Sequence, residues 1–356
     1  MATRRFLSGG ASFAERHPAA VAVMVLLLVY PSFASDFFVF QIGAYSLILG
    51  TVALSLMMLA GYGGMVSLAQ MTVAGFAGYL VAILGDNSAG VMGLGWPWWV
   101  TVPAAVLAAA LLSTCIGAIS VRTEGIYTIM ITLAIAVAFF YFVRQNYVIF
   151  NGFTGFAGVA PPVLFGVNWR DPSPFYYLSL AVAGGCLWAV LHGARSTFGL
   201  SLQAIRDNPR RMRALGYDVT LHRIAAYFLS GLIAGTAGVL LVWFNGRISP
   251  GSVGVDIVID ILVIAVVGGL RHPIGPFLGA VAFVLLENFA IDLIDRERFN
   301  TVIGTAFLLI VLFSPDGLLG LWSRLRARIR LGRNAQPAAG YDKRDGRHPA
   351  GSLEQT

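Results

Sequence analysis

Ten long apolar segments constrain this chain more than any other feature of its sequence. Most approach the roughly 20 residues that a helix needs to cross the hydrocarbon core of a bilayer. The segments cover residues 19–35, 37–60, 66–84, 98–120, 125–143, 174–192, 223–244, 257–270, 275–291 and 299–315. Only 12% of the residues are charged, about half the share expected in a soluble protein. The sequence therefore predicts an all-α, polytopic membrane bundle of about ten transmembrane helices.

The ends of the chain differ from the apolar middle. We expect residues 1–18 to form a cytoplasmic N-terminal segment and residues 19–320 to form the transmembrane domain. Residues 321–356 are basic and poor in apolar side chains, which predicts a largely disordered cytoplasmic tail. Two alternatives stay open. Segments 257–270 and 275–291 can form a re-entrant pair, and a signal-peptidase-like site at residues 32–34 can remove the first span.

The distribution of lysine and arginine predicts the orientation. If the N-terminus lies in the cytoplasm and each segment crosses once, 19 of the 24 basic residues lie on the cytoplasmic side. The other five are Arg144, Arg170, Arg247, Arg296 and Arg298. Such a bias is what the positive-inside rule describes, so both termini are predicted to be cytoplasmic. The rule also explains the net charge of +7 without a nucleic-acid partner.

Residues 193–222 form the most basic internal loop of the chain. Together with its far edge, this loop holds Arg195, Arg206, Arg210, Arg211, Arg213 and Arg223. Each arginine at the bilayer centre costs roughly 2.5–3.5 kcal/mol, so the loop cannot lie in lipid. Phe198, Leu202 and Ile205 recur at helical spacing and predict a first short helix.

A second short helix is predicted after a bend at Asp207-Asn208. Asn208 is a suitable N-cap, Pro209 suits the first helical position, and Gly216 can provide a left-handed C-cap. The apolar contacts that the two helices can offer are Leu202, Ile205, Met212 and Leu215. From these residues alone, two interpretations remain: a docking element for a partner, or a basic helix lying on anionic lipid headgroups.

The pattern AIRDN at 204–208, followed by ALG at 214–216, resembles the cytoplasmic loop of ABC importer permeases for branched-chain amino acids. The resemblance implies that the loop forms coupling helices, which dock into a groove on a separate ATPase subunit. The residues to which it assigns this role are Phe198, Leu202, Ala204, Ile205, Arg206, Asp207, Asn208, Pro209, Ala214, Leu215 and Gly216. The chain departs from the family at residues 209–213, where PRRMR replaces acidic and alanine residues.

Four further stretches resemble the same family and together extend over about residues 40–320. They are GYGGMVSLAQMTVAGFAGY at 61–79, TEGIYTIMITLA at 123–134, VVGGLRHPIGPFLGA at 266–280 and SPDGLLG at 314–320. The set is most similar to the M-type permease, the longer member of the pair. It implies a membrane subunit of an ATP-driven importer for branched-chain amino acids or related small polar solutes, located in a bacterial inner membrane. The implied partners are two ABC ATPase subunits, a second homologous permease in a heterodimer and a periplasmic substrate-binding protein.

The chain itself lacks the residues for nucleotide chemistry. A P-loop needs a Gly-Lys-Ser/Thr sequence, and the only lysine, Lys343, stands between Asp342 and Arg344. The five histidines show no metal-binding spacing, and Cys115 and Cys186 lie in apolar runs as expected for small buried hydrophobes. We therefore expect no enzyme activity, no cofactor and no metal.

An ion-coupled secondary transporter or a passive solute channel is the alternative function. Such a transporter usually places ionisable groups inside the membrane, and Glu287, next to Asn288, is the one carboxylate well inside a predicted span. Asp256 and Asp260 lie one turn apart at the start of a segment, where they can serve as helix-terminal charges. A membrane-embedded enzyme or a scaffold without solute flux is a more distant alternative.

Glycines interrupt two hydrophobic stretches, one early and one late in the chain. Paired interruptions of this kind indicate internal repeats around a central pathway. The pathway residues predicted on this basis are Gly64, Ser67, Gln70, Thr72, Glu287 and Asn288. The alternative is that small residues only let helices approach closely, which Gly231 and Gly235 illustrate.

Two loops are predicted on the outer face, at 144–173 and 245–256. The family resemblance implies that they meet the periplasmic binding protein, with Asn151, Thr154 and Arg247 as candidate contacts. Plain solvated connectors are the alternative interpretation for any one of these residues.

Overall fold

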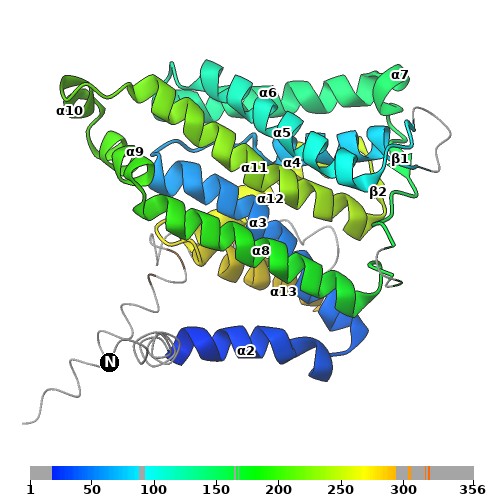
Figure 1. Ribbon diagram of the computed structural model, residues 1–356. Helices are drawn as coiled ribbons and strands as arrows, with labels where there is room; N and C mark the ends of the chain where they lie inside the picture. Colours follow the sequence, from blue (N-terminus) through cyan, green and yellow to red (C-terminus); the bar gives the residue numbers. More distant parts are fainter. Residues whose placement is uncertain are drawn as a thin grey trace, which may run out of the picture.

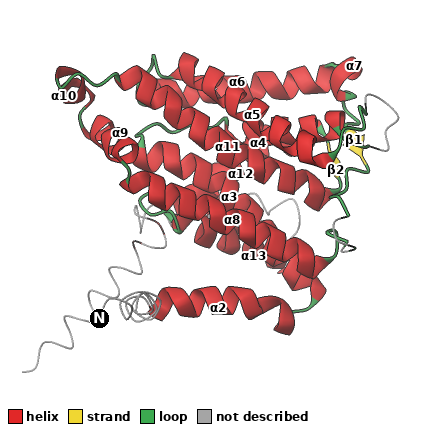
Figure 2. Cartoon of the chain, in the orientation of Figure 1, coloured by secondary structure: helices red, strands yellow, loops and turns green. Residues whose placement is uncertain are grey.

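The computed structural model describes residues 18–87, 93–163, 166 and 168–293, together with residues 304, 305, 317 and 320. Within these ranges the chain is almost entirely helical, and its one β-pair joins β1 (Phe156–Ala157) to β2 (Arg247–Ile248) in antiparallel register. Figure 2 shows helices stacked side by side, with the β-pair at one end of the stack. The predicted all-α bundle is confirmed. The predicted segment at 299–315 and the tail at 321–356 lie almost wholly outside the described residues.

Most helices coincide with the predicted apolar segments. They are α2 (Pro18–Phe33), η1 (Phe38–Ala44), α3 (Tyr45–Met57), η2 (Met58–Tyr62), α4 (Gln70–Leu84), α5 (Trp98–Ser120), α6 (Ile126–Gln145), α7 (Tyr147–Phe150), α8 (Pro172–Arg195), α9 (Thr197–Asp207), α10 (Pro209–Ala214), α11 (Val219–Asn245), η3 (Pro250–Val253), α12 (Val255–Gly268) and α13 (Gly275–Leu293). By length and composition, five helices of the described ranges can cross a membrane. They are Phe38–Tyr62, Trp98–Ser120, Ile126–Gln145, Pro172–Arg195 and Val219–Asn245.

The third predicted segment, 66–84, is shorter as a helix than the sequence indicates. α4 starts only at Gln70, and the preceding residues turn at Gly64, whose φ is +68°. The amides of Gly63 and Met65 both donate to the carbonyl of Leu59, which ends the preceding helix. The Leu68 amide donates to Thr132 Oγ1 at 3.1 Å. Non-helical backbone is tolerated at membrane depth when protein groups satisfy it, as these bonds do here.

α11 is the central helix and packs against α3, α4 and α5. Its glycines set how closely the helices approach. A Cβ on Gly238 would lie 2.8 Å from Ala74 Cα of α4, and one on Gly231 would lie 2.8 Å from Ala110 Cα of α5. Gly235 faces Ala109 of α5 in the same way. The close-packing interpretation of Gly231 and Gly235 is therefore confirmed.

α12 and α13 form an antiparallel hairpin along α3. α12 has 14 residues, so it extends about 21 Å and is shorter than the roughly 30 Å hydrocarbon core. The tip of the hairpin lies at the end of the bundle that carries α9, because Gly61 packs on the carbonyl of Leu270. Gly317 packs against Gly269 at the same tip.

The ends of the loop predicted at 193–222 are helical. α8 continues to Arg195, and α11 begins at Val219 because Asp218 caps it by accepting the Leu221 amide at 2.9 Å. Arg223 belongs to α11. Its guanidinium lies 3.8 Å from Glu124, at the start of α6.

We expect Gly238→Ala to lower the apparent melting temperature of the detergent-solubilised protein. The added methyl group would overlap the backbone of α4, and overpacking of this kind costs about 1–3 kcal/mol. Gly184→Ala in α8 is the matched control, since a Cβ there meets no atom within 4 Å. Equal melting temperatures for the two variants would contradict the close approach of α11 and α4.

Candidate functional site

α9 and α10 project from one end of the bundle, opposite the β-pair (Figure 1). Ser196 Oγ caps α9 by accepting the Gly199 amide, and Asn208 Oδ1 caps α10 by accepting the Arg211 amide at 3.0 Å. Gly216 follows α10 with a φ of +87°. The two short helices, the Asn208 cap and the left-handed Gly216 are therefore confirmed as local structure.

Three of the four apolar contacts predicted for these helices point into the chain itself. Leu202, Ile205 and Met212 are 2%, 0% and 8% exposed, and Ile205 and Met212 pack with Val219 in a small cluster of their own. The prediction that these three side chains are offered to a partner is wrong. An amphipathic stripe buries against the nearest apolar surface, and here that surface belongs to the same bundle. Leu215, at 66% exposed, remains available.

The exposed side of the loop carries apolar residues that the sequence analysis missed. Leu200, Tyr217 and Leu221 are 58%, 44% and 62% exposed. They fall outside the helical stripe, so periodicity gave no signal for them. With Leu215 and three exposed arginines, they make up a set of exposed side chains on the loop and the start of α11, which we call the docking face. Its residues are Leu200, Arg210, Arg211, Arg213, Leu215, Tyr217 and Leu221.

Arg206 connects α9 to the glycine-rich turn before α4. Its Nη1 donates to the carbonyl oxygen of Gly61, while its Nη2 lies 2.9 Å from Asp207 Oδ1. Gly64 lies directly beneath the same side chain, since a Cβ there would come within 2.6 Å of Arg206 Cγ. The structure therefore places Gly64, a predicted pathway residue, against α9 rather than in the interior of the bundle.

The other early pathway residues lie inside the helix packing. Ser67, Gln70 and Thr72 are 0–1% exposed. Gln70 Oε1 accepts from Ser55 Oγ at 3.1 Å and from Ser230 Oγ at 3.4 Å, which joins α4 to α3 and α11. The Gln70 amide nitrogen and Thr72 Oγ1 have no hydrogen-bond partner within the described part of the chain. Gln70 thus lies in a buried polar region with Ser55 and Ser230, Ser67 and Thr72 are buried near it in sequence, and the role of all three predicted residues in a pathway stays a prediction.

Glu287 and Asn288 do not join that polar region. Asn288 donates to the carbonyl of Val284 on its own helix at 2.8 Å. The Glu287 carboxylate lies near Tyr45 and Asp260, at the other end of α3 from Ser55. Tyr45 and Ser55 are ten residues apart in the sequence, or roughly 15 Å along the helix. The two predicted groups of pathway residues are separate places in the fold.

The predicted outer contacts are brought together by the β-pair. Phe156 pairs with Ile248, and Ala157 with Arg247, so the two predicted outer loops share one surface. Asn151 adopts a left-handed conformation with φ +56°, and its side-chain nitrogen donates to the Gly155 carbonyl at 2.7 Å. Thr154 and Arg247 are exposed on the same surface.

Among the described residues, no group of three or more His, Cys, Asp or Glu side chains is arranged to hold a metal ion. Cys115 is exposed on α5 rather than buried as predicted, because it lies on a face of α5 that no helix of the described ranges covers. Cys186 is partly buried, with its Sγ 3.7 Å from Thr236 Oγ1.

Replacement of Arg206 by Met should loosen the turn that it holds. The bond to the Gly61 carbonyl involves a charged but 40%-exposed side chain. We take it as worth about 1 kcal/mol, so hydrogen exchange of the Gly63 and Met65 amides should accelerate about fivefold. Arg210→Met, on the exposed side of α10, is the control and should leave these amides unchanged. Identical exchange in both variants would show that the Arg206 contact does not support the turn.

Comparisons with known proteins agree with this architecture. The family described as "Branched-chain amino acid transport system / permease component" matches residues 38–312. The high-affinity branched-chain amino acid permease LivM of Salmonella typhimurium is 24% identical over 335 residues, which cover 88% of this chain and 76% of the relative. LivM of Escherichia coli is 25% identical over 322 residues, covering 84% and 74%.

A relative with another named substrate also matches. The nucleoside ABC transporter permease NupC of Lactococcus lactis is 25% identical over 240 residues, covering 64% of this chain and 74% of the relative. No solved structure matches the chain. Since the family match extends over more than half of its residues, this multi-pass membrane chain belongs to the permease components of branched-chain amino acid transport systems.

Proposed function

We propose that this chain forms half of the membrane pathway of an ATP-driven importer for branched-chain amino acids or related small polar solutes. The observation that carries the proposal is the docking face. Its apolar side chains and arginines lie exposed on α9, α10, the turn after α10 and the start of α11, whereas Leu202, Ile205 and Met212 of the same segment are buried. A loop that only lay on lipid headgroups would not need this firm attachment to the helices behind it.

The substrates in the names of the relatives support the proposed class of solute but do not identify the solute itself. Both LivM proteins are named for branched-chain amino acids, and NupC is named for nucleosides. All of these solutes are small and polar. The buried region around Gln70, Ser55 and Ser230 offers hydroxyl and amide groups without a fixed charge. We therefore propose Ser67, Gln70 and Thr72 as pathway residues that become accessible when α3, α4 and α11 separate.

We propose that two ABC ATPase subunits serve the transporter and that one of them binds the docking face. A displacement of α9 would pull on Arg206 and so on the turn at residues 61–64. That turn leads directly into the buried residues at the start of α4. In this way the nucleotide cycle of the ATPase would open the bundle alternately toward each side of the membrane.

The remaining partners follow from the two ends of the bundle. We propose that the end with α9 and α10 is cytoplasmic, as the excess of arginine there indicates. Both termini are proposed to lie on that side, and the position of Gly317 against Gly269 at the same end supports this for the C-terminal part. The surface with Asn151, Thr154 and Arg247 would receive a periplasmic binding protein. A second, homologous permease would complete a heterodimer in the bacterial inner membrane.

One observation favours a second candidate, ion-coupled transport by this chain alone. Glu287, Asp260 and Tyr45 lie near one another, partly buried between α3, α12 and α13. Carboxylates inside a membrane bundle commonly mark ion pathways. The two candidates differ in liposomes that contain only this chain, since an ion-coupled transporter would accumulate solute along a proton or sodium gradient and an ABC permease would not.

The double variant Asp207→Lys and Asn208→Lys should insert normally but lose most ATP-driven uptake. It removes the ion pair that holds Arg206 and the cap of α10, while leaving the buried anchors Leu202 and Ile205 in place. Uptake of radiolabelled leucine by cells or proteoliposomes measures the effect. Arg122→Glu, in the exposed turn between α5 and α6, is the control. Wild-type uptake by the lysine variant would refute the coupling role.

Removing apolar area from the docking face should weaken ATPase binding. Each leucine that the complex with the ATPase buries contributes about 1.5–3 kcal/mol to binding. The double variant Leu215→Ser with Leu221→Ser should therefore bind the ATPase at least tenfold more weakly. The amount of ATPase that co-purifies with the tagged chain is the measurement. Ile126→Ser, at a 67%-exposed position near the same end of the bundle, is the control. Unchanged co-purification of the double variant would show that the partner binds elsewhere.

A further inference from the structure

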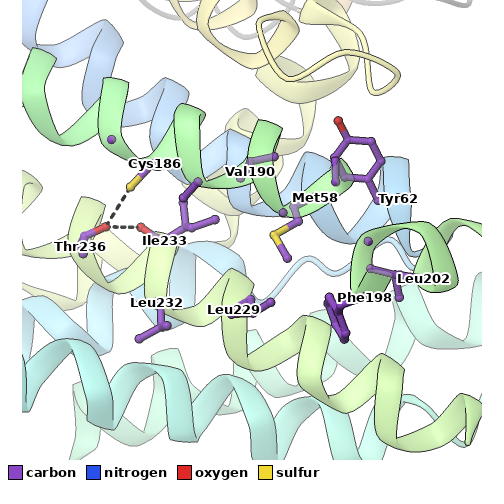
Figure 3. A pocket seen from close by; sticks show the side chains of 15 residues that line it. Met58, Tyr62, Cys186, Val190, Phe198, Leu202, Leu229, Leu232, Ile233 and Thr236 are labelled. Atoms are coloured by element: carbon purple, nitrogen blue, oxygen red, sulfur yellow. Dashed lines mark hydrogen bonds between the residues drawn. The ribbon is translucent and has the colours of Figure 1, made fainter. Parts of the chain in front are cut away.

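A groove of about 270 Å³ opens between α8 and α11, directly beside α9. Figure 3 shows Met58, Leu229, Ile233 and Phe198 around it, contributed by three separate parts of the fold. Thr236 also borders the groove, but its hydroxyl is already bonded to the Ile233 carbonyl at 2.8 Å. The walls are therefore hydrocarbon. Such a surface does not hold water well and offers no hydrogen bonds to a polar solute.

The groove has room because α8 places mostly small residues along this wall. Gly185, Ala189 and Gly193 line it, and a Cβ on either glycine would meet no atom within 4 Å. On the opposite wall, α11 places Leu229 and Ile233, and Met58 and Val190 form part of the floor. A whole helix, about 10 Å wide, cannot enter a space of this volume. An extended hydrocarbon chain can.

The end of the groove near α9 carries a positive charge. Arg195, the last residue of α8, is exposed and lies close enough to Tyr62 for its charge to act on the phenol. Tyr62 itself lines the groove. Within the described residues Arg195 has no acidic partner at ion-pair distance, since the two ion pairs there involve Arg206 and Arg223. A positive charge at the edge of an apolar groove is complementary to an amphiphile with a negatively charged headgroup.

We propose that this groove binds one acyl chain of an anionic phospholipid from the cytoplasmic leaflet, with the lipid phosphate beside Arg195 and Tyr62. An acyl chain that moves from the bilayer into the groove gains no hydrophobic free energy, so van der Waals packing and the attraction of the headgroup to Arg195 would hold it there. Basic sites between transmembrane helices on the cytoplasmic side recognise anionic headgroups by the same charge complementarity. This site goes beyond the proposed function, since lipid binding here requires neither an ATPase nor a transported solute.

The lipid would touch the helix pair that the proposed ATPase moves. Phe198 and Leu202 of α9 both line the groove, and the Phe198 ring stacks on His222 with centroids 5.8 Å apart. An acyl chain between α8 and α11 would fill the space into which α9 could otherwise settle. The bound lipid thus forms part of the support of α9.

Photo-crosslinking tests the site. The purified chain, with the subunits that co-purify, is placed in nanodiscs with phosphatidylglycerol or phosphatidylcholine bearing a diazirine in the acyl chain. Mass spectrometry should map the phosphatidylglycerol adducts to residues 185–202 and 229–236, at least fivefold above phosphatidylcholine at equal mole fraction, since about 1 kcal/mol of headgroup attraction is expected near one arginine. Arg195→Gln should bring the two lipids to the same level, and Arg122→Gln should not.

The adjacent residues Gly185 and Gly184 provide a test position and a matched control for the groove. Gly185→Leu fills the groove and should remove most adducts, whereas Gly184→Leu points into open space beside it and should leave them. If Gly185→Leu fails to insert, Ala189→Val carries the same expectation. Equal labelling of the two leucine variants would overturn the proposal. So would equal labelling by both lipids in the wild type.

Discussion

The absence of water inside a bilayer governs this structure, because each backbone amide and carbonyl must find a partner within the protein. Long helices meet the requirement on their own. The turn at residues 61–69 does not, and it is held by bonds from other elements: Arg206 to the Gly61 carbonyl, and the Leu68 amide to Thr132. Both contacts come from parts of the chain far away in sequence. The irregular backbone thus ties the interior of the bundle to α9.

The glycines of the bundle determine how closely its helices pack. Gly238 on α11 and Gly61 on the turn let backbone meet backbone, at Ala74 and Leu270 respectively. Close approach of this kind supplies van der Waals contact where no hydrophobic effect drives helices together. Gly185 on α8 is different, since nothing packs against it. The same residue type therefore marks tight packing in the centre of the bundle and an open groove at its side.

Local chemistry explains which features of the site the sequence predicts. The Asn208 cap, Pro209 after it and the left-handed Gly216 depend only on neighbouring residues, and all three are present. Leu202 and Ile205 show the limit. Their spacing predicts that one side of a helix is buried, but it does not indicate which surface covers that side. In the structure the bundle itself covers both residues. Likewise, nothing in the sequence indicates that Gly64 contacts Arg206, 142 positions later.

The docking face and the buried polar region require different environments, and Arg206 links the segments that carry them. A surface that binds a soluble motor must be exposed and charged, whereas groups that pass a polar solute must be buried and uncharged to avoid trapping ions. Direct contact between the two would expose the interior to the cytoplasm. Under the proposed function, a single guanidinium that holds a carbonyl at the end of a helix would transmit movement of α9 without opening a path for water. The turn at residues 61–64, rather than either surface, would then be the place where this fold couples motion to access.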